Sequence, residues 1–237
     1  MAAPMPSPVP TYHTKTYPTI SPESPAVSQK GKNVFITGAS QGIGREMALS
    51  FAKANVSSLA VLGRKQNLLD EVAEKVKNTY PHVSVHVYTA DLTDFSSTEK
   101  AFTSFAEAVN GPIHTLIANA GYSAGMKPAV ECDEDHLIGT MTTNLLGLRN
   151  SYRAFLPHIS KEAIEGTRYK AKFIHTSTGA AHTNMPYNSS YSIAKLACAK
   201  YMEFVAMEHA DIQALSFHPG LVSISRNELK ISINVHR

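Results

Sequence analysis

A tyrosine and a lysine lie four positions apart in the sequence, at Tyr191 and Lys195. On a helix this spacing places both side chains on one face, about one turn apart. A phenol can give a proton to an oxygen or take one from it, but its ordinary pKa of about 10 is too high for efficient exchange near neutral pH. A neighbouring ammonium group lowers that pKa. The pair therefore indicates general acid–base chemistry, whereas Tyr191 taken alone would be interpreted as an aromatic side chain that packs on its helix.

Further polar side chains precede the pair at positions that suit this chemistry. Two adjacent hydroxyl residues, Ser177 and Thr178, stand upstream of the tyrosine, and a hydroxyl there would hold the oxygen of a carbonyl or alcohol substrate. Asn144 would help to order water for a proton relay. His175, beside these hydroxyls, is expected only to fill a strand position. The crevice beyond the fourth predicted strand would be lined by Asn119, Ala120 and Gly121.

A glycine-rich turn follows the first predicted strand directly and leads into a helix. Glycines let a backbone turn sharply and approach a pyrophosphate closely, and the helix N-terminus then offers free amides and the positive end of its dipole. The strand–turn–helix context favours nucleotide binding over a mere tight turn. The residues concerned are Thr37, Gly38, Ala39, Ser40, Gln41, Gly42, Ile43 and Gly44.

The residues that end the second and third predicted strands indicate which nucleotide would bind. A carboxylate after the second strand would bind a ribose 2′-hydroxyl and repel a 2′-phosphate, but the chain has Gly63 and Arg64 there. An arginine without a neighbouring acid favours the 2′-phosphate, and hence NADP over NAD. Asp91 and Leu92 follow the third strand, where a contact with adenine is expected. The alternatives are a solvated surface charge for Arg64 and a turn or capping carboxylate for Asp91.

Strand-like and helix-like segments alternate from Lys32 onward. This alternation predicts an α/β fold, a single domain with a Rossmann-type, doubly wound parallel sheet. The predicted strands are 33–37, 59–62, 83–87, 113–118, 173–176 and 212–217. The predicted helices include one from near Gly42 with Ile43, Met47 and Phe51 at fourfold spacing, one with Ser96 and Glu99 as its capping box, a long one from about Asp133 to Leu156, and one over 189–209.

The composition is that of a globular protein. The chain has 237 residues, 43% of them hydrophobic, and a net charge of +3, which is too small to argue for nucleic acid or an anionic membrane. Seven of the 13 prolines lie between the start of the chain and Pro25, so 1–30 is expected to be a partly disordered extension, with Tyr17–Ile20 as an extended arm.

The two cysteines lack a metal-ligand spacing, and no metal site is expected. With no signal or membrane-spanning pattern, the expected location is cytoplasmic.

Jointly these segments resemble the short-chain dehydrogenase/reductase family, over about Lys32 to Val222. The segments that carry the resemblance are the 37–44 turn, Asp91, 119–121, Asn144 to Gly147, the Ser177-Thr178 pair, Tyr191 with Lys195, and Pro219, Gly220 and Val222. The proline-rich arm ending in 28–32 resembles that of fungal members, many of which serve secondary metabolism. The resemblance implies an NADP-dependent oxidoreductase acting on a carbonyl or secondary alcohol, and family members are usually homo-oligomeric.

The resemblance also assigns roles. Tyr191 would donate or accept the proton, Lys195 would lower its pKa and bind the nicotinamide ribose, and Asn144 would support the proton relay. The cofactor would be lined by Ile43, Asp91, Asn119 and Val222. The family's substrate-orienting serine usually stands at a set spacing before the tyrosine, and that spacing favours Thr178 here, although Ser177 is adjacent and is the only serine of the segment.

The sequence departs from the family after Val222. Family members continue with a cofactor-binding threonine, a substrate lid, a helix and a last strand, whereas this chain has Ile224 at the threonine position and ends at Arg237. We therefore expect 31–222 to be the catalytic domain and 223–237 an atypical tail, arising from an unspliced intron, a mis-set gene model or a truncation. Lower stability and weakened turnover would follow. The alternative function is a nucleotide-binding protein without turnover, a remnant or partner of an enzyme.

Overall fold

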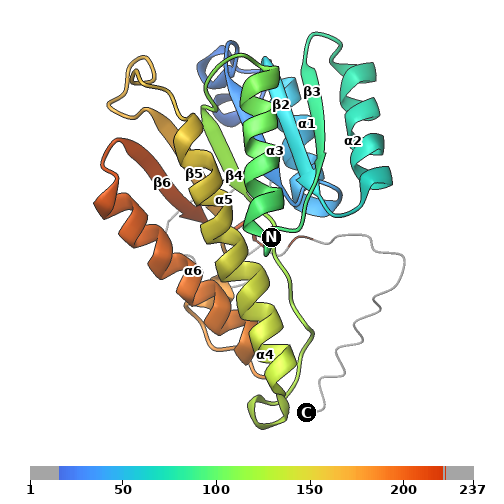
Figure 1. Cartoon of the computed structure of the whole chain (residues 1–237), viewed down its shortest axis with the longest axis vertical. Helices are drawn as coiled ribbons and strands as arrows, with labels where there is room; N and C mark the ends of the chain where they lie inside the picture. The colour runs from blue at the N-terminus through green and yellow to red at the C-terminus, as the bar shows by residue number, and fades with distance from the viewer. Residues whose placement is uncertain (1–15, 221, 223–237) are drawn as a thin grey trace.

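The computed structural model describes residues 16–220 and 222 (Figure 1). Six parallel strands form one sheet in the order β3-β2-β1-β4-β5-β6. The predicted doubly wound α/β fold is confirmed, because the chain moves outward from β1 to β3 and then returns to place β4 on the other side of β1. The strands are β1 (Asn33–Thr37), β2 (Ser58–Gly63), β3 (Ser84–Thr89), β4 (Thr115–Ala118), β5 (Ala171–Thr176) and β6 (Ile212–Phe217).

The helices cover both faces of the sheet. Right-handed crossovers place α1 (Gly42–Lys53) and α2 (Gln66–Thr79) on one face while the chain runs from β1 to β3. After β3 the chain crosses the sheet in the opposite direction, so three helices pack on the opposite face: α3 (Phe95–Ala108), α5 (Gly147–Phe155) and α6 (Ser189–Glu208). Figure 1 looks onto α3 and α5. The reversal lies between β1 and β4, where open α/β sheets form their binding crevice.

Successive side chains of β1 point to opposite faces of the sheet, so the apolar core is divided into two clusters. Phe35 points toward α3 and stacks on Phe102 with ring centroids 3.8 Å apart. Val34 and Ile36 point the other way, into the cluster that contains Ala48 of α1. Both faces of the central strand are buried, which explains why it reads as a continuous apolar run.

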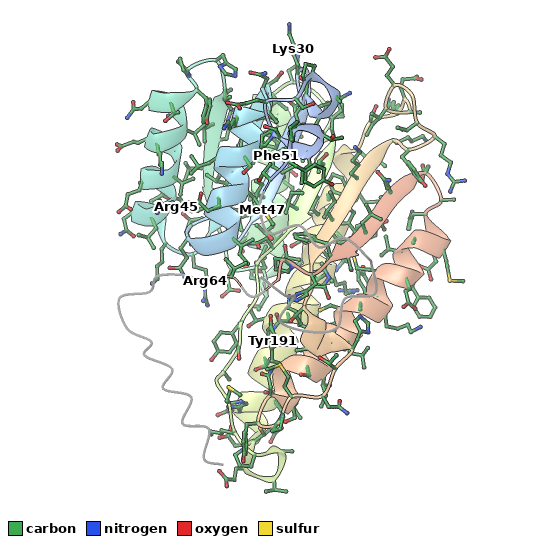
Figure 2. All side chains as sticks on the ribbon, turned by 180° about the vertical axis from the view of Figure 1, so that it is seen from behind. Lys30, Arg45, Met47, Phe51, Arg64 and Tyr191 are labelled. Atoms are coloured by element: carbon green, nitrogen blue, oxygen red, sulfur yellow. The ribbon has the colours of Figure 1, made fainter. Side chains whose placement is uncertain are left out.

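The face of α1 that is fully buried differs from the fourfold apolar series in the sequence. Gly44, Ala48 and Ala52 are buried, whereas Met47 and Phe51 are half-buried at its flanks (Figure 2). Small side chains let the helix axis approach the sheet closely, and the larger ones then cover the edges of the contact. Close approach also brings the first turn of α1 up to the end of β1.

One predicted helix cap is corrected, and the predicted long helix is confirmed with a π-helical turn inside it. The Ser96–Glu99 capping box is wrong, because Asp94 caps α3 and its carboxylate accepts from the backbone amides of Ser96 and Ser97 at 3.0 and 3.3 Å. The long helix predicted from about Asp133 to Leu156 is a continuous helical run with three consecutive parts. They are α4 (Glu134–Met141), a π-helical segment (Thr142–Leu146) and α5.

The described part of the N-terminal extension is not an extended arm. Pro18–Ile20 and Pro25–Val27 form 3₁₀ turns with proline at the first position, where its fixed φ and missing amide cost nothing. The extension is held by Gln29, whose amide donates to the Ala54 carbonyl at 2.7 Å. The expectations for residues 1–12 and 223–237 lie outside the described residues. Within 16–220, no helix has the length and apolar character needed to cross a membrane.

Candidate functional site

The glycine turn adopts a conformation that requires glycine. Gly38 and Gly42 have φ of +66° and +56°, in the left-handed region that other residues avoid. Gly44 has an ordinary φ but no room, since a Cβ there would lie 2.2 Å from the Gly38 carbonyl oxygen and 2.6 Å from Nδ2 of Asn119. The turn therefore folds α1 back against the residues that follow β4.

Asn119 and Thr37 tie the ends of β1 and β4 together. Nδ2 of Asn119 donates to the carbonyls of Gly38 and Thr37 at 3.1 and 3.3 Å. In return, the hydroxyl of Thr37 accepts from the backbone amides of Asn119 and Ala120, each at 3.2 Å. The side-chain amide of Asn119, which the family resemblance assigns to the cofactor lining, is thus committed to holding the glycine turn.

The N-terminus of α1 is open. Gln41 occupies the cap position in an extended conformation without a side-chain hydrogen bond to the first turn. The backbone amides of that turn therefore have no side-chain cap, which is the arrangement that binds an anionic group. Beside it, Ser40 packs over Gly63, where an added Cβ would lie 3.4 Å from the serine hydroxyl. These residues fit the phosphates of a dinucleotide.

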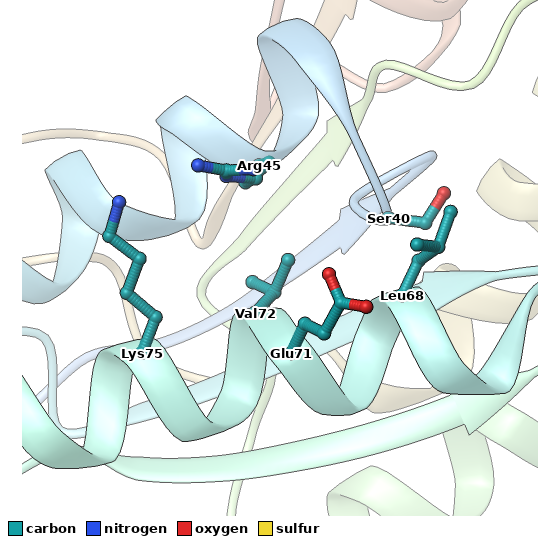
Figure 3. Close-up of a pocket in the computed structure, with 6 residues that line it drawn as sticks. All are labelled: Ser40, Arg45, Leu68, Glu71, Val72 and Lys75. Atoms are coloured by element: carbon teal, nitrogen blue, oxygen red, sulfur yellow. The ribbon is translucent and has the colours of Figure 1, made fainter. Parts of the chain in front are cut away.

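A cavity of about 240 Å³ lies beside Ser40, between α1 and α2 (Figure 3). Arg45 reaches toward it from α1, and Glu71 and Lys75 reach toward it from α2. It belongs to the face of the sheet opposite α6, so it is separate from the Tyr191–Lys195 pair. Its remaining lining is Leu68 and Val72.

Arg64 and Asp91 stand at the carboxyl ends of β2 and β3. Figure 2 shows Arg64 at the same end of the molecule as Tyr191. Its exposed guanidinium makes no ion pair or hydrogen bond to any other residue that the structure describes. The Asp91 carboxylate accepts from the amide and hydroxyl of Thr93 at 2.9 and 2.8 Å, and these bonds, with a smaller contribution from the Arg64 charge, lower its pKa. Asp91 therefore shapes the turn after β3 and leaves Arg64 free to bind a ligand anion.

Leu92, also predicted near adenine, is buried against α5. Its carbonyl accepts from Nδ2 of Asn150 at 2.8 Å, and its Cβ lies 3.3 Å from where a Cβ on Gly147 would be. Asn150 is a buried positioning residue that no pattern in the sequence marks. It fixes the loop after β3 on α5.

Lys195 is the most constrained charged residue of the site. Only 3% of its surface is exposed, and Nζ donates to the Thr176 carbonyl at 2.9 Å. Nζ also lies 3.4 Å from Nε2 of His175 and 5.9 Å from the ring centre of Tyr191. Burial lowers the pKa of Lys195, because a low-dielectric surrounding disfavours the charged form. The predicted pair is therefore brought together on α6.

Tyr191 is half-buried at the first turn of α6. Burial raises the pKa of its hydroxyl, and the nearby Cys198 thiol raises it further. The lowering that we expected from Lys195 is not found in the protein alone, where both contributions raise the pKa of Tyr191. The phenol stays protonated near neutral pH, which suits a proton donor.

Asn144 lies in the π-helical segment and is buried. Its Nδ2 donates to the carbonyls of Tyr122 and Thr140 at 2.6 and 2.8 Å, and its Oδ1 accepts from the Tyr122 amide at 3.3 Å. A Cβ on Gly121 would lie 3.1 Å from this oxygen and 3.4 Å from Nζ of Lys195. Gly121 therefore lets the loop after β4 run between Asn144 and Lys195, joining the nucleotide end of the crevice to the tyrosine end.

The two candidate hydroxyls differ in accessibility. The Ser177 hydroxyl is buried and has no hydrogen-bond partner among the described residues. Thr178 is half-buried, and its Oγ1 accepts from the Ala180 amide at 3.3 Å, which leaves its proton free to donate. Of the two, Thr178 is thus the one open to a ligand.

Beyond β6, Pro219 and Gly220 continue from the same edge of the sheet, with Gly220 at φ +83°. Within the described chain, no hydrogen bond or ion pair connects these residues or Val222 with the tyrosine.

His175, by contrast, was expected only to fill a strand position, and it lies against Lys195. The sequence held no signal for this, since the contact depends on how β5 faces α6.

Comparison with known proteins identifies the family. A model of the short chain dehydrogenase family matches residues 32–232, most of the chain. The chain belongs to this family. A relative, the short chain dehydrogenase tazN of Aspergillus terreus, is 34% identical over 88% of the chain, which spans only 44% of that protein. The NADP-dependent 3-hydroxy acid dehydrogenase of Schizosaccharomyces pombe is 29% identical over 81% of this chain and 72% of its own.

Solved structures agree on the fold. A short-chain type dehydrogenase/reductase from Mycobacterium ulcerans superposes with a TM-score of 0.77 at 20% identity, over 84% of this short-chain dehydrogenase and 70% of its own chain. A short chain dehydrogenase from Burkholderia cenocepacia in complex with NADP superposes with a TM-score of 0.73 at 21% identity, over 83% of this chain and 77% of the Burkholderia chain.

The packing at Gly44 predicts that Gly44→Ala destabilises the fold by about 1–3 kcal/mol, because a backbone carbonyl and the Asn119 amide would have to move. Gly139→Ala is the matched control: it lies in α4 with open space around its Cα, so it should be neutral or stabilising by up to about 1 kcal/mol. Urea unfolding of both variants measures the difference. Equal stabilities would contradict the packing.

His175 predicts a pH dependence of stability. Burial and the neighbouring Lys195 charge lower its pKa from 6.5 to about 3, so between these values the unfolded chain binds a proton that the folded protein does not. This contribution to stability is full above pH 6.5 and is lost as pH falls toward 3, by up to about 1.4 kcal/mol per pH unit.

His175→Gln removes the imidazole that binds this proton. As pH falls over this range, the unfolding free energy of the variant should therefore fall less steeply than that of the wild type. His82→Gln, at an exposed position, controls for the loss of an imidazole. Urea titrations at several pH values provide the test, and parallel curves for wild type and His175→Gln would contradict the prediction.

Proposed function

We propose that this short-chain dehydrogenase reduces a carbonyl to an alcohol, or catalyses the reverse oxidation, with NADP as cofactor and Tyr191 as general acid/base. One observation carries the proposal: Tyr191 and the buried Lys195 meet at the carboxyl edge of the sheet, where Gly121 joins them to the glycine turn. Family membership supports the reaction class.

The side chains divide the chemistry among them. NADPH supplies a hydride to the carbonyl carbon when it is bound. The Thr178 hydroxyl donates a hydrogen bond to the carbonyl oxygen and orients the substrate. Tyr191 gives its proton to that oxygen as negative charge develops there, and the ammonium of Lys195 stabilises the resulting phenolate. Asn144, whose side chain holds the Tyr122 backbone, keeps the 119–122 loop in place beside them.

The choice of NADP rests on Arg64. It is exposed, makes no hydrogen bond or ion pair to another residue that the structure describes, and follows β2, where a 2′-phosphate would lie. The described residues at this edge fit a dinucleotide through the glycine turn and the uncapped start of α1. A relative whose name states NADP dependence, and a structural neighbour that holds NADP, support the same choice.

The remaining expectations form part of the proposal. Residues 31–222 make up the catalytic domain, the substrate is a small carbonyl compound or alcohol, and the protein works in the cytoplasm. The resemblance to fungal members of the family, many of which serve secondary metabolism, supports such a role, and relatives in Aspergillus terreus and Schizosaccharomyces pombe are fungal. Exposed apolar side chains on α6, among them Ile193, Phe204 and Met207, suit the homo-oligomer that the family usually forms. The competing function, nucleotide binding without turnover, would use the same glycine turn, so only turnover separates the two.

Tyr191→Phe tests turnover. Loss of the hydroxyl removes the proton donor, so NADPH oxidation with a panel of carbonyl compounds should fall at least roughly 100-fold. Tyr201→Phe, further along the same helix, is the control and should keep wild-type rates. If wild type and Tyr191→Phe are equally slow while NADPH still binds, the protein acts by binding alone.

Arg64→Ala tests the cofactor. Loss of a charge-assisted contact to the 2′-phosphate should weaken NADPH binding roughly 10- to 100-fold and leave NADH binding within about twofold. Arg168→Ala, an exposed arginine in the loop before β5, should change neither. Fluorescence titration with both nucleotides measures the ratio, and equal losses for NADPH and NADH would refute the assignment of Arg64.

A further inference from the structure

We propose that His175 is a positioning residue that holds the ammonium group of Lys195, in a tautomer that Lys195 fixes and Ser216 accommodates. The inference rests on the proposed function, since it concerns how the lysine of the Tyr191 pair is kept in place. It assigns a role to a buried imidazole that neither the residue pattern nor the family resemblance had marked.

The imidazole has two polar neighbours, one on each side. His175 is 1% exposed on β5, with Nε2 3.4 Å from Nζ of Lys195 on α6 and Nδ1 3.3 Å from the Ser216 hydroxyl on β6. His175 and Ser216 are partners in the parallel register of β5 and β6. The imidazole therefore bridges the active-site helix and the neighbouring strand.

The chemistry of these neighbours determines the tautomer. An ammonium group can only donate hydrogen bonds, so Nε2 of His175 must offer its lone pair to Lys195. The ring proton then resides on Nδ1 and is donated to the Ser216 oxygen. A doubly protonated ring would set two cations side by side in a buried place. Burial and the charge of Lys195 lower the pKa of His175, which is consistent with a neutral ring.

This arrangement limits the orientation of Lys195. Two of its three N–H groups have acceptors, the Thr176 carbonyl and Nε2 of His175. The third has no partner within the described chain, and Gly121 leaves space beside Nζ. His175 and Thr176 thus hold the lysine by two donors so that the third is available to a ligand in the crevice.

A first experiment measures the tautomer on the protein without ligand. Long-range ¹H–¹⁵N correlation NMR at pH 7 should show His175 neutral and protonated at Nδ1. His114 is an internal reference for the opposite form, because its Nδ1 accepts the Asn33 amide at 3.0 Å. Ser216→Ala should shift the His175 Nδ1 signal and leave that of His114 unchanged. An Nε2-protonated or a charged His175 would overturn the proposal.

A second experiment separates positioning from general stability. His175→Phe keeps a ring but removes the acceptor, so kcat/KM for NADPH-dependent reduction should fall roughly 10- to 100-fold. Without the acceptor the ammonium form is less stable, so the alkaline limb of the kcat profile should move to lower pH. The titratable groups that contribute to this limb are Lys195, Tyr191 and Cys198, all on α6.

His175→Gln restores an acceptor and should recover most of the rate and the original limb. His86→Gln on β3 is the control for loss of a partly buried histidine. If His175→Phe, folded by circular dichroism, keeps wild-type rates and pH profile while Tyr191→Phe abolishes turnover, positioning by His175 is refuted and the proposed function stands. If Tyr191→Phe has no effect, the proposed function fails, and the NMR result alone decides the contact between His175 and Lys195.

Discussion

The side-chain amide of Asn119 is the contact on which the two halves of the sheet depend. It donates to backbone carbonyls of the glycine turn, and Thr37 returns hydrogen bonds to the loop after β4. Buried carbonyls at a sharp turn need partners, and here the partner comes from the opposite half of the fold. Because Gly121 lies two residues later against Lys195 and Asn144, one short loop sets the relation between the glycine turn and the Tyr191–Lys195 pair.

A buried cation next to a neutral phenol gives the site its electrostatic character. Lys195 is desolvated, yet no carboxylate pairs with it in the described part of the chain, and its partners are a carbonyl and an imidazole. Neutral acceptors satisfy the geometry of the ammonium without cancelling its charge. In the reaction that we propose, the remaining positive field would stabilise negative charge only when it forms, on the tyrosine or the substrate oxygen, so it would act on the reaction rather than on the resting protein.

The sequence predicted the sheet, its doubly wound class and the Tyr191–Lys195 pair, because period-2 and helical patterns and residue spacing are local properties. It did not predict the buried face of α1, where Gly44 and Ala48 lie inside because close packing against the sheet outweighs side-chain size. Nor did it predict that Asn119 is used by the glycine turn, or that His175 contacts Lys195. Those depend on which side chains face one another across β1, β4, β5 and α6, and no spacing along the chain encodes that.

The π-helical turn at Thr142–Leu146 has a consequence for the phase of its helix. A π turn holds one residue more than an α turn, so it rotates everything beyond it by about 100° relative to what precedes it. Asn144 can face the loop after β4 while Tyr152 and Phe155 still face the core. Asn144 and the core-facing side chains of α5 thus occupy different angular registers of one continuous helix, and the Asn144 bond to the Thr140 carbonyl stabilises the step between them.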